Sequence, residues 1–366
     1  MAAVLVAPTR AAVAAVAGPD ANAALAAGLQ ADLASDPTVP GEALAVRAPG
    51  LTTALAVGAA NTATGAPLKV DTPFRIASIT KTFVAAAVLR LVEQGKVQLD
   101  ERITRYLSPH SAEILRHDGY AVDDITVRQL LQHTSGLYDY ATDPAYDDVN
   151  VTDPSHRWTR AEQLKFATEH GDPLFDPGQG YAYADTNYIL LGELLERVTH
   201  KTLPAAVRTL LHFRRLGLDH TYWELLEPTP PGTPELAHQY YGTGFDNVVL
   251  DGSFDLYGGG GLVSTVDDLA RIYRALFHDK VFDRRSTLRT MTTPSGPGRE
   301  TGAGMGIFVV DVAGERCYAH RGYWGSQAVH CPGLDVTFAR TFNQAAENVD
   351  DNALEPIIVD AVKSAQ

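Results

Sequence analysis

Cysteine is scarce in this chain: the 366 residues include only Cys317 and Cys331. So few thiols exclude a disulfide-rich scaffold and a zinc ribbon, both of which need more of them. The chain also lacks an H-E-x-x-H sequence and closely spaced cysteine pairs, so we expect neither a metal nor another cofactor. The two cysteines flank an expected hairpin. Two buried free thiols are the preferred interpretation, and a disulfide across the hairpin remains open.

Basic residues are also in deficit, with 30 Lys and Arg against 44 Asp and Glu and a formal net charge of −14. Binding to phosphate backbones needs a basic face, so a nucleic-acid partner is not expected. Apolar runs stay below the roughly 18 residues of a membrane-spanning helix, so no membrane span is expected. The N-terminal MAAVLVAPTR has no basic region ahead of its apolar residues, which argues against a cleaved signal peptide. The compartment, exported or cytoplasmic, and the oligomeric state stay open.

Strand patterns occur near both ends of the chain and helical patterns fill its middle. Strands are expected at 42–50, 53–61, 306–312, 316–322, 326–333 and 335–342, and helices at 22–35, 125–137, 161–171, 187–200, 203–218 and 352–366. This order predicts an α+β fold: an antiparallel sheet built from both chain ends and flanked by helices, with an inserted mostly helical lobe. Residues 1–99 and 256–366 would form the sheet domain and 100–255 the helical domain, with the active site between them.

A serine and a lysine stand three residues apart at the start of an apolar helical pattern, in FRIASITKTFVAAAVLRLVEQGK. Side chains three apart on a helix share one face, so Ser78 and Lys81 are expected to be neighbours. The apolar residues that follow predict a buried lysine, and burial disfavours its charged form. A neutral amine could take the proton of the Ser78 hydroxyl. The helix is expected to end at Gly95.

The spacing alone has a simpler interpretation. An S-x-x-K pattern arises by chance about once in a chain of this length. Ser78 could cap the helix while Lys81 extends its amine to the surface. The neighbouring motifs distinguish the two interpretations.

Several stretches together resemble a known family. The stretches IASITKTF, ITVRQLLQHTSGLYDY, PGQGYAYADTNYILLGELLE, GGGGLVSTVDDLARIY and YAHRGYWGSQAV follow in this order, from roughly residue 40 to 345. They resemble the landmarks of the penicillin-recognising serine hydrolases: class C β-lactamases, actinomycete-type D-alanyl-D-alanine carboxypeptidases, D-aminopeptidases and related esterases. The carboxypeptidases are the most similar group. This resemblance implies the β-lactamase/transpeptidase-like fold and catalysis through an acyl-enzyme.

The resemblance assigns a first and a second motif. Ser78 would be the nucleophile and Lys81 its proton partner. The second motif, usually Y-x-N, matches Tyr183-Ala184-Asp185, which makes Tyr183 the general acid/base. Asp185 departs from the usual Asn and cannot donate an amide hydrogen bond to a substrate carbonyl. It could hold Lys81 charged or attract a substrate ammonium.

The third motif, K-T-G or H-x-G, matches His320-Arg321-Gly322. The resemblance implies that His320 lines the site and tunes Tyr183, and that the backbone N–H groups of Ser78 and Tyr323 form the oxyanion hole. Gly322, without a Cβ, would let the strand approach the substrate. His133, in QHTSG, is expected only to support its loop.

Arg321 is a second departure, because the carboxypeptidases usually have Thr there and a basic residue on the preceding strand. Phe308 occupies that earlier position here. Arg321 could restore a positive charge for a substrate carboxylate, which is the preferred interpretation. The alternative is that Arg321 points away and the site accepts esters or amides without a free carboxylate.

Other motifs point away from competing enzyme classes. The run Gly258–Gly261 lacks the Lys-Ser/Thr of a Walker phosphate loop, and no G-x-S-x-G of an α/β-hydrolase is present. The predicted function is a serine hydrolase that forms an acyl-enzyme, acting as a D-alanyl-D-alanine carboxypeptidase or D-amino-acid peptidase. An esterase or β-lactamase of the same fold, and a catalytically silent penicillin-binding relative, are the alternatives. The expected partner is a small peptide, ester or β-lactam substrate.

Overall fold

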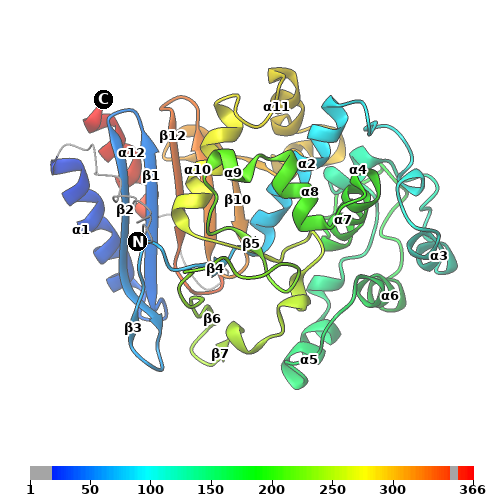
Figure 1. Cartoon of the computed structure of the whole chain (residues 1–366), viewed down its shortest axis with the longest axis horizontal. Helices are drawn as coiled ribbons and strands as arrows, with labels where there is room; N and C mark the ends of the chain where they lie inside the picture. Colours follow the sequence, from blue (N-terminus) through cyan, green and yellow to red (C-terminus); the bar gives the residue numbers. More distant parts are fainter. Residues whose placement is uncertain (1–18, 347–352) are drawn as a thin grey trace, which may run out of the picture.

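A seven-stranded antiparallel sheet forms one half of the molecule in the computed structural model, which describes residues 19–346 and 353–366 (Figure 1). The strand order is β3-β2-β1-β12-β11-β10-β9. The bounds are β1 Gly41–Ala48, β2 Leu51–Asn61, β3 Ala66–Pro67, β9 Phe308–Val312, β10 Glu315–Gly322, β11 Ser326–Cys331 and β12 Val336–Thr341. Because β1 pairs with β12, the sheet joins the two ends of the chain, and the predicted fold class is confirmed. The N-terminal stretch considered as a signal peptide lies outside the described residues.

Helices cover both faces of this sheet. The terminal helices α1 (Pro19–Ser35) and α12 (Leu354–Ala365) pack together on one face, over an apolar cluster that includes Leu25, Val46, Phe338 and Ile358. On the other face lies α10 (Val266–Phe277), which contacts β1, β11 and β12. The α10 sequence VDDLARIYRALF has apolar residues on the inward face of a 3.6-residue repeat, which is why it lies flat on the sheet.

The other half of the molecule is mostly helical and extends from the centre to the right-hand side of Figure 1. It contains α2 (Thr80–Glu93), α3 (Pro109–His117), α4 (Val127–Leu131), α5 (Pro144–Thr152), α6 (Arg160–His170), α7 (Asp185–Thr199), α8 (Leu203–Leu210), α9 (Phe213–Leu216) and α11 (Arg285–Thr292). Helix α2 ends at Glu93, close to the expected stop, where Gly95 takes a left-handed φ of 70°. It packs against α7, α8 and α11, and its residues from Thr80 to Leu91 are buried.

Short strands join the two halves. Strands β4 (Phe74–Arg75), β8 (Leu262–Ser264) and β5 (Tyr222–Trp223) form a small sheet, and β6 (Tyr240–Tyr241) pairs with β7 (Phe245–Asp246) in a hairpin. The sequence patterns do not predict β5, β6 or β7, because two-residue strands carry no usable periodicity.

The two cysteines correct one expectation. Cys317 on β10 and Cys331 on β11 are joined by a disulfide, with Cα atoms 4.2 Å apart. The preference for two free thiols is therefore wrong. The pairing of Tyr318 with His330 places the two cysteines directly opposite each other, and that register is not visible in the sequence.

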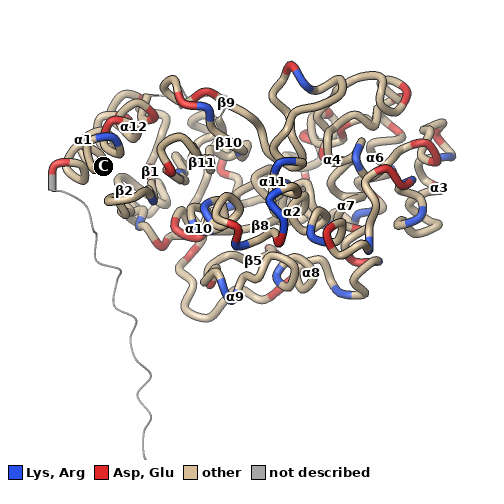
Figure 2. Tube along the Cα trace, turned by 90° about the horizontal axis from the view of Figure 1, so that it is seen from above, with Lys and Arg blue, Asp and Glu red and all other residues tan. Residues whose placement is uncertain are grey.

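Charged residues of both signs are interspersed along the trace over most of the molecule, as Figure 2 shows. Among the residues that the structure describes, no helix has the length and apolar character needed to cross a bilayer.

Candidate active site

The segment that carries Ser78 contacts β10 and β11 on one side and α2 on the other. A short 3-10 helix, Ala77–Ile79, leads into α2 and carries Ser78 one turn before Lys81. Ala77 has a φ of 44°, an unfavourable conformation for a residue with a Cβ. The segment is held by Ile76, whose N–H donates to the Leu262 carbonyl at 3.0 Å. Backbone strain next to a serine at a helix start is consistent with a functional position.

Lys81 lies within hydrogen-bonding distance of three acceptors. Its fully buried Nζ donates to Ser78 Oγ at 2.8 Å and to the Gly259 carbonyl at 2.7 Å, and it lies 2.6 Å from Asp185 Oδ1. An ammonium group has three hydrogens to donate, so this set of partners matches the protonated form. All three partners of Nζ are oxygen atoms that can accept a hydrogen bond, and one of them belongs to the Asp185 carboxylate.

Tyr183 is placed against the same lysine. Lys81 Nζ lies 4.9 Å from the centre of the Tyr183 ring. The phenol oxygen is buried and forms no hydrogen bond of ordinary geometry with a described residue, although the Ser78 hydroxyl is near enough to lower the phenol pKa. Burial has the larger effect and, together with Asp185, raises the pKa of Tyr183 well above its ordinary value. Tyr183 is therefore a neutral phenol before substrate binds.

His133 contacts the loop that carries Tyr183, a loop that its QHTSG context did not point to. The His133 ring stacks on Tyr183 with centroids 4.3 Å apart, and its Nδ1 accepts from the Ala184 N–H at 3.1 Å. The His133 carbonyl accepts from the Ala182 N–H at 3.0 Å. Burial and the nearby Lys81 hold the pKa of His133 well below its usual value, so the ring is neutral.

His320 and Phe308 form the wall on the sheet side. The His320 ring lies 6.4 Å from that of Tyr183 and 5.3 Å from that of Phe308. His320 Nδ1 lies 2.8 Å from the Arg321 carbonyl, which can only accept, so Nδ1 carries the hydrogen and Nε2 presents a lone pair. Burial, with a smaller effect of Lys81, lowers the pKa of His320 to about 3. The structure thus brings His320 and Phe308 together with Tyr183.

Gly322 contributes through packing. A Cβ there would collide with Ser326 Oγ and with the carbonyl of Ile76, two residues before the nucleophile. Its lack of a side chain therefore lets β10 approach the nucleophile segment, whereas the sequence suggested an approach to the substrate. Tyr323 follows at the end of β10 with its side chain 46% exposed. The oxyanion-hole role of its N–H stays a prediction.

Arg321 is separated from the other predicted residues. It is exposed and lies between His320 and Gly322 on β10, so its side chain takes the opposite face of the strand. That face also carries Cys317 and Ala319, which pack in the apolar cluster under α1 and α12. The structure does not bring Arg321 to Ser78, which goes against the preferred role in binding a substrate carboxylate.

Two aspartates that the sequence motifs do not single out accompany Asp185. The backbone N–H of Asp185 donates to Asp139 Oδ1 at 2.9 Å. Burial and the charge of Asp185 raise the pKa of Asp139 to about 7, and the same two causes raise that of Asp255 to about 7. Asp139 lies in the stretch HTSGLYDY, so its position next to a family motif could have identified it from the sequence. Nothing in the sequence could have identified Asp255, because only the folded chain brings it near Lys81.

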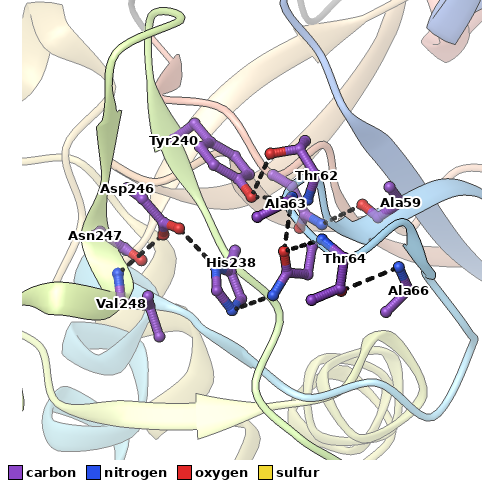
Figure 3. A network of polar contacts seen from close by, with 12 residues as sticks. Ala59, Thr62, Ala63, Thr64, Ala66, His238, Tyr240, Asp246, Asn247 and Val248 are labelled. Atoms are coloured by element: carbon purple, nitrogen blue, oxygen red, sulfur yellow. Dashed lines mark hydrogen bonds and ion pairs between the residues drawn. The ribbon is translucent and has the colours of Figure 1, made fainter.

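The β6–β7 hairpin borders the third motif. His238 links the hairpin to β2, because its Nδ1 lies 2.5 Å from Asp246 Oδ2 and its Nε2 lies 2.9 Å from the Asn61 amide nitrogen (Figure 3). The Tyr240 hydroxyl accepts from the Thr62 N–H in the same network. The next residue, Tyr241, stacks on Tyr323 with ring centroids 6.5 Å apart. These contacts fix an aromatic pair at the end of β10.

Two hollows on the surface lie elsewhere. One of about 450 Å³ is lined by turn residues around Gly50 and Gly333, and one of about 260 Å³ is lined by residues of α10 and Arg47. Neither includes a residue named above for the site. The candidate active site is therefore defined by the residues around Ser78 and not by the volume of a surface cavity.

The chain is similar to several known proteins. The family model described as "Beta-lactamase" matches residues 23–363. Esterase EstB of Burkholderia gladioli is 37% identical over 162 residues, covering 43% of this chain and 40% of its own length. A putative D-alanyl-D-alanine carboxypeptidase of Escherichia coli is 25% identical over 326 residues, covering 79% and 74%.

Among solved structures, a D-stereospecific amidohydrolase from Streptomyces sp. superposes with a TM-score of 0.75 and 28% identity, covering 88% of this chain and 94% of that one. The chain spans less than half the length of the first curated relatives it matches: 40% of EstB and 48% of penicillin-binding protein 4* of Bacillus subtilis.

Proposed function

Because the chain belongs to the beta-lactamase family, we propose that it is a serine hydrolase that cleaves amide or peptide bonds of D-amino acids through an acyl-enzyme on Ser78. Membership of this family of serine hydrolases confirms the resemblance predicted from the motifs. The activity and the substrate of the whole protein remain our proposal.

One observation carries the proposal: Lys81 Nζ contacts both the Ser78 hydroxyl and the Asp185 carboxylate, beside the Tyr183 ring. A structural lysine would need no serine and no phenol. In this site a proton can pass from the serine through the lysine to a carboxylate. The buried ammonium and carboxylate, 2.6 Å apart, can exchange one proton to become amine and acid, because low polarity reduces the preference for the charged pair.

The first half of the reaction follows from these contacts. Ser78 Oγ attacks the substrate carbonyl carbon, its proton moves to Lys81 Nζ, and Lys81 passes one of its own to Asp185 Oδ1. Backbone N–H groups of Ser78 and Tyr323 would stabilise the oxyanion. The C–N bond then breaks as the leaving amine takes the Tyr183 proton. Lys81 stabilises the resulting phenolate and returns the proton held by Asp185.

The second half releases the acyl group. Water attacks the ester carbon on Ser78, and its proton moves through the same Tyr183–Lys81–Asp185 path. The bond between the acyl carbon and Ser78 Oγ then breaks, the carboxylic acid leaves, and Oγ takes back through Lys81 the proton held by Asp185. The neutral His320 would serve as a wall and a hydrogen-bond acceptor near Tyr183, since its low pKa keeps it uncharged.

The nature of the substrate follows from Arg321 and Phe308. The cation expected to bind a free carboxylate lies on the other face of β10, and an apolar ring stands beside His320. This arrangement favours amides and peptides whose leaving group lacks a nearby carboxylate over D-alanyl-D-alanine termini. The Streptomyces relative named as D-stereospecific supports the D-configuration. Ester hydrolysis is the second candidate, because Phe308 suits an apolar group and EstB is among the relatives.

The proposal is tested by steady-state hydrolysis of D- and L-alaninamide, D-alanyl-D-alanine, p-nitrophenyl acetate and a chromogenic cephalosporin. We expect turnover of D-alaninamide above that of L-alaninamide and of D-alanyl-D-alanine, and none by Ser78→Ala. Preference for the cephalosporin would identify a β-lactamase. Undiminished turnover by Ser78→Ala would refute the nucleophile.

A further inference from the structure

Three carboxylates lie near Lys81: Asp185 contacts it, and Lys81 lowers the pKa of both Asp139 and Asp255 through its charge. Asp185 pairs with Lys81 and Asp139 accepts from the Asp185 backbone. Asp255, the last residue of the 3-10 helix Gly252–Asp255, lies over the glycine run: a Cβ on Gly260 would collide with its carboxylate. The preceding Gly259 gives its carbonyl to Lys81. Asp255 therefore lies next to the part of the glycine run that contacts Lys81.

The charges in this cluster are not balanced. Lys81 can match one carboxylate, and that one is Asp185. Arg75 also lowers the pKa of Asp255, yet its guanidinium is bound by Glu224 at 2.8 Å through two nitrogens and by the carbonyls of Asn247 and Leu250. A further positive charge beside Asp255 would leave only one of the three carboxylates without a cation.

Polar atoms without partners point to the place of that charge. Asp255 Oδ1 is enclosed and has no hydrogen-bond partner among the described residues. The Tyr140 hydroxyl is fully buried, also lacks a partner there, and has its pKa raised by burial and then by Tyr146, Asp185, Asp255 and Asp139. An unpaired buried acceptor is costly, so a donor from water or from a ligand would stabilise it. Asp255 keeps some exposed surface, although not at Oδ1, whereas Asp139 and Asp185 are buried, so Asp255 is the carboxylate of the three that lies closest to solvent.

A metal ion does not explain the cluster, because the described residues contain no group of three or more His, Cys, Asp or Glu side chains arranged to hold one. An organic ammonium needs no such geometry. The α-ammonium of an amino-acyl group is attached to the carbon next to the carbonyl that Ser78 would attack. It therefore enters the site with every substrate that has a free amino terminus.

We propose that Asp255 binds the α-ammonium of the acyl group, so that the substrates are amino-acid amides or peptides with a free amino group. This rests on the proposed function, and it adds a specificity-determining residue to it. An N-acylated substrate would leave Asp255 Oδ1 unpaired and would place a neutral amide in an acidic site.

The test is the binding of D-alaninamide and N-acetyl-D-alaninamide to the Ser78→Ala chain, measured by calorimetry so that turnover plays no part. We expect D-alaninamide to bind at least about tenfold more tightly, a difference of about 1.4 kcal/mol. Adding Asp255→Asn should remove the difference. The matched control is Asp251→Asn, because Asp251 caps the same 3-10 helix and pairs with Arg157; it should keep the preference.

Equal affinities for the two amides, or a preference that survives Asp255→Asn, would overturn the assignment. Failure of the proposed function gives a different result. In that case the unmodified chain would show the binding preference and yet release no ammonia from D-alaninamide.

Discussion

Lys81 and Asp185 set the protonation states of the site at the scale of single residues. An Asn at position 185 could donate to a substrate but could not take a proton. The aspartate instead faces Lys81 at 2.6 Å, with 8% of its side chain exposed. We infer that this chain uses the position for proton transfer and leaves the orientation of the substrate to other groups.

Asp185→Asn tests that inference. The Asn keeps an oxygen acceptor for Lys81 and loses the site that takes the proton, so we expect kcat at neutral pH to fall by about 100-fold. The acidic limb of the kcat–pH profile should also move. The exposed Asp172→Asn is the control and should change neither. An unaltered kcat and profile in Asp185→Asn would exclude the carboxylate from the proton path.

Close contacts between elements place the nucleophile. The end of β10 lies against the segment before Ser78, where the Ile76 carbonyl accepts from Ser326 Oγ at 3.2 Å. Gly322 is the residue that makes this approach sterically allowed. Strand β8 fixes the other side through the Leu262 carbonyl. The position of Ser78 thus depends on two separate sheets.

Gly322→Ala should disrupt this packing. The new Cβ would meet backbone, which cannot rotate away, so we expect β10 to shift and activity to drop by at least about 100-fold, as small displacements of reacting groups can do. Gly244→Ala, where a Cβ meets nothing within 4 Å and φ is not left-handed, is the matched control. Both variants would be assayed on p-nitrophenyl acetate with circular dichroism to monitor folding. Full activity in a folded Gly322→Ala would contradict the packing role.

At the scale of the whole molecule, the buried acids near Lys81 lower the free energy of unfolding at neutral pH. Asp139 has a pKa of about 7 in the fold against 3.8 as its ordinary value. Between these values the folded chain binds more protons than the unfolded chain. The free energy of unfolding contributed by Asp139 therefore falls as pH rises from about 4 to about 7.

Asp139→Asn should remove this loss, because its amide oxygen can still accept from the Asp185 N–H. We expect its Tm to exceed that of the parent chain at about pH 8 by on the order of a few °C, and the two values to converge near pH 4. Thermal unfolding followed by circular dichroism measures both. A difference that is the same at both pH values would mean that the effect is packing and not titration.

The local parts of the site could be predicted from the sequence, and its long-range parts could not. Ser78 and Lys81 lie three apart where a 3-10 helix leads into α2, so their contact follows from local helical geometry. The motifs singled out Tyr183 and His320, whose rings lie 6.4 Å apart in the structure. Because side chains alternate along a strand, the sequence RCYAHRG already predicts that Arg321 and His320 lie on opposite faces of it.

Asp255 and the disulfide show what the sequence leaves open. Asp255 reaches Lys81 only because the chain folds back through the glycine run. The bond between Cys317 and Cys331 requires the register of β10 on β11, which a one-residue slip would change. Both depend on tertiary structure, on which local periodicity carries no information.

The most direct test of the central claim, that Lys81 prepares Ser78 to form an acyl-enzyme, is mass spectrometry of the chain after treatment with a fluorophosphonate. We expect one adduct, on Ser78 in the peptide that follows Arg75. Labelling should be lost in Ser78→Ala and much slowed in Lys81→Ala. An adduct on another residue, or undiminished labelling of Ser78 in Lys81→Ala, would contradict it.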